Sequence, residues 1–181
     1  MAITNEAVIQ AVSDELFKNE ELNVFAVLDG ASIPDLLQQL YELQPESVCL
    51  YRGELEPDMA EVAPYLVKLK QDSDFTDWLI EKGWGEHWGI YALSHESMSA
   101  MRRHFRAFLV VYTPENKPVY FRYYDPRVMR VYLPTCNVEE LSKVFGPVEH
   151  YLLEDVDAKT ALRFRNDSGE LRREKLSLLE E

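Results

Sequence analysis

The chain has 181 residues, of which 46% are hydrophobic, and it carries a formal net charge of −13. A chain of this size buries a core in one domain or two small lobes without needing disulfides or a metal, and its two cysteines, Cys49 and Cys136, suit a reducing compartment. The acidic balance argues against a nucleic-acid partner, and without a signal-peptide pattern or a stretch long enough to cross a bilayer we expect a cytoplasmic protein with no membrane partner.

Hydrophobic periodicity predicts helices and short strands along most of the chain. A helix is expected where apolar residues recur at helical spacing after a capping residue, and a strand where a short apolar or alternating run is bounded by turn residues. In chain order we expect a helix over residues 5–18, a strand over 23–28, a helix capped by Ser32 with Pro34 in its first turn, a strand over 47–51, a loop or broken helical turn over 57–64, a strand over 65–69, a helix capped by Ser73 or Asp74, a strand over 88–93, a helix capped by Ser97, a hairpin of 108–112 with 119–124, a helix capped by Asn137, and strands over 150–153 and 161–165.

This pattern predicts a mixed α/β fold with a central, mostly β sheet and flanking helices. The strand, helix and strand between residues 23 and 51 lie within about thirty residues, which is typical of a βαβ unit. A division near residues 94–106 or 133–137 would give two small lobes. The polar, charged tail from Glu170 predicts a helix or a frayed end.

Residues 119–128 contain the densest group of candidate functional side chains. The predicted strand should stop at Asp125, because Pro126 has no N–H to donate and pushes the preceding residue toward an extended conformation. Arg122, Asp125 and Arg127 would then meet where the strand ends. Such a cluster can fasten a turn through bidentate carboxylate bonds, or it can contact a partner protein.

Strand alternation suggests which side chains face outward. Val119, Phe121 and Tyr123 would share one face of the strand, while Tyr120, Arg122 and Tyr124 would share the other. If the first face is core, the second offers two tyrosines and an arginine. Trp84 and Tyr123 are further aromatic candidates that equally fit a core position. The residues we expect to bind a partner or fasten the turn are Tyr120, Arg122, Tyr124, Asp125, Arg127, Arg130, Arg106 and Trp88.

Enzyme motifs are absent from the sequence. It has no Walker loop and no dinucleotide fingerprint, and His95-Glu96 is not followed by the second histidine of a zincin site, so we expect no cofactor, no metal and no enzyme activity. One alternative is a small cytosolic hydrolase that uses Cys136 or a pair of acids. Cys49 suits this role less, because it falls in a predicted buried strand where a thiolate is disfavoured.

Charge is unevenly distributed along the chain. Residues 1–60 hold 12 acidic and 2 basic side chains, a net of −10, whereas residues 101–130 hold 2 acidic and 7 basic ones, a net of +5. Such a distribution suits a protein partner of mixed charge. A second alternative is an acidic immunity or decoy protein that blocks a basic target through Glu42, Glu46, Glu54, Glu56 and Asp58.

Six short segments follow one another along the chain in a recognisable order. They are Ala26–Ala31, Pro64–Val67, Trp88–Ile90, Met101–Arg106, Phe121–Val128 and Val144–Val148. This ordered series resembles the type VI secretion adaptor family known as domain of unknown function 4123. The string Phe-Arg-Tyr-Tyr-Asp-Pro-Arg is the specific part of the resemblance, and the other segments gain force from their order.

This resemblance implies a bacterial chaperone or adaptor that is not an enzyme. Such a protein binds a toxic effector in the cytoplasm and promotes its loading onto the VgrG spike, so its expected partners are an effector segment and VgrG. It also implies an adaptor domain over residues 1–150. Family members commonly have a second, helical lobe, so residues 151–181 are expected to be a short C-terminal extension formed by a strand and a polar tail.

Overall fold

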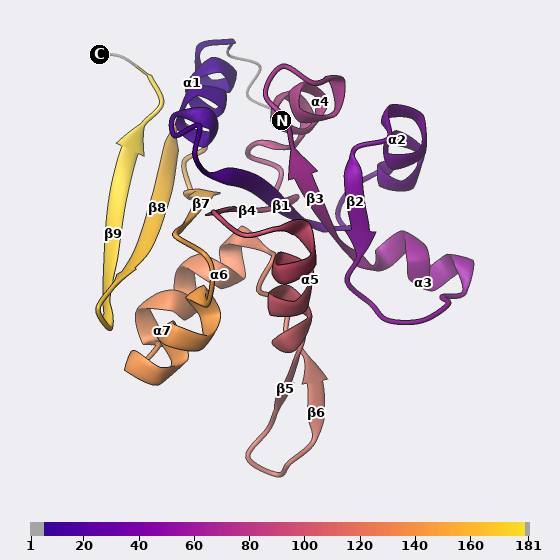
Figure 1. Cartoon of the computed structure of the whole chain (residues 1–181), viewed down its shortest axis with the longest axis vertical. Coiled ribbons are helices and arrows are strands. Elements are labelled where there is room, and N and C mark those ends of the chain that lie inside the picture. The colour runs from indigo at the N-terminus through magenta and orange to yellow at the C-terminus, as the bar shows by residue number, and fades with distance from the viewer. Residues whose placement is uncertain (1–5, 180–181) are drawn as a thin grey trace.

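Helices cover both faces of one seven-stranded antiparallel sheet in the computed structural model, which describes residues 6–179 (Figure 1). The strand order is β2-β3-β1-β4-β7-β8-β9, and β5 and β6 form a separate hairpin. The strands are β1 (Asn23–Asp29), β2 (Glu46–Cys49), β3 (Pro64–Leu69), β4 (Gly89–Ser94), β5 (Val110–Tyr112), β6 (Pro118–Tyr120), β7 (His150–Glu154), β8 (Thr160–Asp167) and β9 (Glu170–Ser177). The helices are α1 (Glu6–Phe17), α2 (Leu36–Leu43), α3 (Pro57–Val62), α4 (Asp74–Gly83), α5 (Met98–Ala107), α6 (Pro126–Tyr132), the 3-10 helix Leu133–Thr135 and α7 (Val138–Phe145).

The continuous apolar run of β1 is explained by two separate cores. Val24, Ala26 and Leu28 pack into one core together with α1, α2 and α4. Phe25 and Val27 point the other way and pack with α5, α6 and α7. Successive strand side chains alternate between the two faces, so a sheet covered on both sides needs apolar residues at every position.

The mixed α/β class is confirmed. The predicted βαβ connection from β1 through α2 to β2 joins two strands that are not neighbours in the sheet. Both strands are antiparallel to β3, which lies between them, so β1 and β2 run in the same direction without pairing. The sheet also continues across the two candidate lobe boundaries, because β4 pairs with β7. Residue 150 is the first residue of β7, and the same sheet extends through β8 and β9.

Two local predictions are wrong. Ser32 does not cap α2, because its hydroxyl donates to Asp29 Oδ2 at 2.8 Å, and α2 begins at Leu36 after Asp35 in a left-handed conformation (φ 61°). Over residues 170–179 the tail is neither a helix nor frayed. Ser168 and Gly169 both have positive φ and reverse the chain, so β9 pairs with β8 as a charged edge strand.

The predicted strand over residues 119–124 is also too long. The hairpin itself is confirmed, but β6 ends at Tyr120, and Phe121 makes a last backbone bond to Leu109. The chain then leaves the strand conformation, so the predicted alternation of faces fails and both Tyr123 and Tyr124 are buried. Because a buried phenol needs a polar partner, the Tyr123 hydroxyl donates to the carbonyl of Phe105 at 2.8 Å.

Candidate partner-binding surface

The Asp-Pro-Arg sequence starts a helix that the sequence analysis did not predict. Asp125 has an extended conformation (φ −81°, ψ 120°), Pro126 occupies the first helical position of α6, and Asp125 Oδ1 accepts the N–H of Arg127 at 2.9 Å. An aspartate cap followed by proline is a strong helix-start signal. The residues that predicted the end of a strand therefore start a helix, because β6 has already ended at Tyr120.

Asp125 and Arg127 form the bidentate pair expected from the sequence. Arg127 donates from Nε to Oδ1 at 3.1 Å and from Nη2 to Oδ2 at 2.8 Å. Burial of the Asp125 carboxyl opposes ionisation, but the hydrogen bonds from Arg127 outweigh it and hold the pKa of Asp125 below its ordinary value. The guanidinium of Arg127 is half-exposed, so the pair lies at the protein surface.

Arg122 does not pair with Asp125 but with Asp29, which the sequence analysis did not identify. Asp29 is the buried last residue of β1 and accepts bonds from the Ala31 N–H at 3.1 Å, the Ser32 hydroxyl at 2.8 Å and Arg122 Nη2. A buried carboxylate requires such partners. Its position directly after an apolar run is the one signal in the sequence that marks it.

A second buried carboxylate, Glu154, lies at the same end of the sheet, at the end of β7. It accepts the backbone N–H groups of Gly85 at 2.6 Å and His87 at 3.0 Å, and its Oε1 lies 2.6 Å from His87 Nδ1. Burial raises the pKa of Glu154 more than these bonds lower it. Arg130 Nη1 donates to the Glu154 carbonyl oxygen at 3.1 Å and so joins α6 to β7.

These contacts form one charged group at the end of β1 and β7, which we call the edge cluster. It fastens α6 and the loop after α4 to the sheet, and each of its carboxylates has hydrogen-bonding partners. A role of the cluster in partner binding stays a prediction. Its members are Asp29, Arg122, Asp125, Arg127, Arg130 and Glu154.

Four aromatic candidates are core or near-core residues. Tyr124 is buried, and burial raises the pKa of its phenol. Trp84 is buried and donates its indole N–H to the Ala158 carbonyl at 2.7 Å. Trp88 is partly buried against Trp78, with 5.2 Å between ring centroids. Tyr123, described above, is fully buried as well.

Tyr120 is the aromatic candidate that the structure exposes. It lies in the β5–β6 hairpin, which projects from the body of the molecule at the bottom of Figure 1. The exposed fractions of its apolar side chains are 67% for Tyr112, 66% for Tyr120, 42% for Val119, 39% for Val110 and 37% for Val111. A two-stranded hairpin has no core of its own in which to bury these side chains, so they remain in contact with water. Exposed apolar patches of this kind mark sites of interaction with other molecules.

A groove of about 410 Å³ separates the hairpin from the loop after β2, and we call it the hairpin groove. Tyr51 and Tyr120 face each other with 5.4 Å between ring centroids. Arg106, another predicted site residue, donates to the Leu50 carbonyl at 3.2 Å and the Cys49 carbonyl at 2.8 Å. The residues that line the groove include Leu50, Tyr51, Arg52, Arg106, Val110 and Tyr120.

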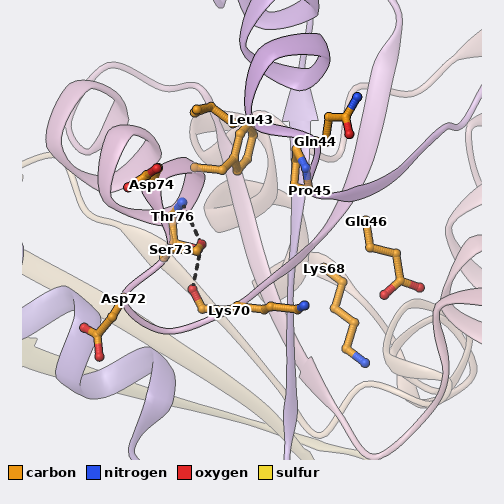
Figure 2. Close-up of a pocket in the computed structure, with 11 residues that line it drawn as sticks. Leu43, Gln44, Pro45, Glu46, Lys68, Lys70, Asp72, Ser73, Asp74 and Thr76 are labelled. Carbon is orange, nitrogen blue, oxygen red and sulfur yellow. Dashed lines mark hydrogen bonds between the residues drawn. The ribbon is translucent and has the colours of Figure 1, made fainter.

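A second hollow, of about 390 Å³, lies between the end of α2, the sheet edge and the start of α4 (Figure 2). Ser73 caps α4 by accepting the Thr76 N–H, and its hydroxyl is within 3.0 Å of the Lys70 carbonyl. Lys68 and Lys70 point away from Asp72 in Figure 2, and no ion pair joins them to it. The hollow is polar and open and brings no reactive groups together.

Residues 6–179 show little that fits the enzyme alternative. Cys136 is half-buried; burial raises the pKa of its thiol more than the hydrogen bond with the Tyr132 side chain lowers it, which disfavours the nucleophilic thiolate. Within the same residues, no group of three histidine, cysteine or acidic side chains could hold a metal ion, and no helix could cross a membrane. The five acids of the decoy hypothesis are exposed. They lie on α2, on the edge strand β2, on α3 and in the loop between β2 and α3.

Comparison with known proteins gives one match. The family model described as domain of unknown function (DUF4123) matches residues 24–143. No curated protein and no solved structure matches the chain. The matched stretch runs from β1 into α7, so it contains the hairpin and the groove and all of the edge cluster except Glu154.

Proposed function

We propose that this chain, which belongs to the DUF4123 family, is an adaptor of type VI secretion. In this proposal the protein binds a toxic effector in the bacterial cytoplasm and promotes its loading onto the VgrG spike. It acts without covalent chemistry, by covering an apolar segment of the effector until the segment is transferred.

The observation that carries the proposal is the β5–β6 hairpin. Its five exposed valine and tyrosine side chains lie on a projection that packs little against the rest of the chain. Full burial of one such apolar side chain contributes about 1.5–3 kcal/mol. A partner that covers several of them therefore gains several such contributions to its binding free energy. Tyrosine is also among the residues that dominate interface energetics.

Co-purification from the native host tests the proposal. Tagged wild-type protein should retain an effector and VgrG, identified by mass spectrometry, and replacement of residues 110–120 by a short Gly-Ser linker should release the effector. The control is Val156→Ser, because Val156 is 82% exposed but lies outside the hairpin. Wild-type protein that retains neither partner, or a hairpin replacement that retains both, would contradict the proposal.

A further inference from the structure

The hairpin presents one continuous apolar face to the groove. Its register pairs Val110 with Tyr120 and Tyr112 with Pro118, and backbone bonds join Leu109 to Phe121 and Thr113 to Lys117. Side chains alternate across a strand, so Val110, Tyr112 and Tyr120 share a face. Val110 and Tyr120 line the groove, and Tyr112 extends the same surface beyond it.

The edges of the hairpin are free to accept another strand. β5 and β6 pair only with each other within residues 6–179. In an antiparallel pair, residues between the hydrogen-bonded positions direct their backbone N–H and C=O groups outward. The bonds at Leu109–Phe121 and Thr113–Lys117 place Val110, Tyr112 and Tyr120 at such outward positions. Pro118, which lacks an N–H, lies there as well. An extended segment in the groove would find backbone partners as well as apolar contacts.

Two arginines line the groove, and a third lies one helical turn away on α5. Arg52 and Arg106 line the groove, and Arg102 lies one turn before Arg106 on α5. Within the described part of the chain, none of the three forms an ion pair, although Glu54 and Glu56 follow Arg52 in the same loop. Burial lowers the pKa of Arg106, and the positive charges of Arg102 and Arg52 lower it further, so both cations act on Arg106.

Two of the three arginines, Arg102 and Arg106, lie in a basic part of an otherwise acidic chain. The whole chain carries a net charge of −13, yet the segment that forms α5, the hairpin and α6 is basic. Cations without acidic partners beside an apolar surface attract a ligand that offers both carboxylates and apolar groups. A basic or purely polar segment would leave either the charges or the apolar face unmatched.

We propose that the hairpin groove binds an extended segment of a partner protein in which acidic side chains alternate with apolar ones. Carboxylates of the segment pair with Arg52 in the groove and with Arg102, one turn before the groove residue Arg106 on α5, and its apolar side chains pack on Val110 and Tyr120. This inference rests on the proposed adaptor function for the class of partner and adds the chemistry by which the segment is recognised.

Peptide binding to the full chain tests the inference directly. The probes are fluorescently labelled synthetic peptides of one length in which Glu alternates with Leu, Lys alternates with Leu, or Glu alternates with Ser. We expect the Glu-Leu peptide to bind at least about tenfold more tightly than the other two by fluorescence anisotropy, since a good charged or apolar anchor contributes that factor or more.

Substitutions then locate the site. Arg52→Glu and Tyr120→Ser should each weaken the Glu-Leu peptide by about tenfold or more. The matched controls are Arg173→Glu on the exposed edge strand β9 and Tyr41→Ser, which is 80% exposed on α2. All four positions are exposed, so thermal melts should show folded protein in every case. Equal binding of the three peptides, or equal loss in site and control variants, would overturn the inference.

Three further outcomes are distinguishable. Sedimentation that shows a concentration-dependent dimer of the wild type, lost in Arg52→Glu, would mean that a second copy occupies the groove and would overturn the inference. If Arg52→Glu and Tyr120→Ser still co-purify the effector from the host, the groove inference fails while the adaptor function stands. If the wild type co-purifies no partner but binds the Glu-Leu peptide selectively, the adaptor function fails while the groove remains a peptide site.

Discussion

The carboxylate of Asp125 has two roles that two substitutions separate. It caps α6 by accepting the Arg127 N–H, and it pairs with the Arg127 guanidinium. Asp125→Ala removes both, whereas Asp125→Asn keeps an oxygen for the cap and removes only the ion pair. Loss of a cap costs about 0.5–2 kcal/mol. The ion pair contributes about 0–1 kcal/mol, because the guanidinium of Arg127 is half-exposed.

Thermal unfolding measures the difference. For a chain of this size about 1 kcal/mol lowers Tm by about 2–4 °C, so a cost of about 2 kcal/mol for Asp125→Ala corresponds to about 4–8 °C. Asp125→Asn should lose no more than about 4 °C. Arg127→Ala is the matched control, because it removes the ion pair and leaves the cap. A wild-type Tm for Asp125→Ala would refute the stabilising role of the cap, and equal losses in the Ala and Asn variants would assign the whole effect to the ion pair.

Acid titration checks the ionised state of the same group. The pKa of Asp125 is lowered in the folded protein, so its ionised form contributes stability above the ordinary carboxyl pKa. That contribution is lost as pH falls through the lowered value. The stability difference between wild type and Asp125→Asn should therefore shrink in acid. A difference that stays constant down to acid unfolding would contradict the assignment.

Three further outcomes follow from buried groups. Arg122→Ala removes one of the donors to the buried Asp29 carboxylate and should cost about 1–3 kcal/mol in urea unfolding; an unchanged midpoint would contradict the pairing. Burial lowers the pKa of His104 from 6.5 to about 4, so the unfolded state binds more protons between these values and stability should fall as pH drops through them. His104→Gln should flatten that part of the pH profile, and an unchanged slope would contradict it. A Cβ on Gly89 would lie 2.3 Å from the Val27 carbonyl, so Gly89→Ala should abolish soluble expression; soluble protein with a wild-type melt would contradict the close approach of β1 and β4.

Local chemistry made part of the fold predictable. Ser73 and Asn137 cap helices as the sequence indicates, because a cap depends on residues within one turn of it. The same rule applies to Asp125 and Pro126, which mark the start of a helix as well as a possible end of a strand. The charged tail predicts a helix or a frayed end, but the two positive-φ residues before it form a turn that leads into β9.

The edge cluster could not be predicted because its pairs are distant in sequence. Arg122 and Asp29 are 93 residues apart, and Glu154 and Gly85 are 69 apart. Nothing in a single sequence says which arginine reaches which buried carboxylate until the sheet order brings the strand ends together. The sequence therefore indicates Arg122, Asp125 and Arg127 as a group, whereas the hydrogen-bonding partner of Arg122 is the distant Asp29.

In the proposed function, substitutions in the edge cluster and on the hairpin face affect partner binding by different physical routes. The edge cluster fixes α6, and α6 follows directly from the segment that ends the hairpin, so substitutions at Asp125 or Arg122 change stability and hairpin placement together. Side chains on the exposed hairpin face contribute little to folding, so Tyr120 can be changed without loss of the native state. Arg106 lies between these cases, because it holds two backbone carbonyls of the loop while it lines the groove. A loss of binding is therefore evidence of direct contact only where Tm is unchanged, and among the predicted site residues Tyr120 satisfies that condition best.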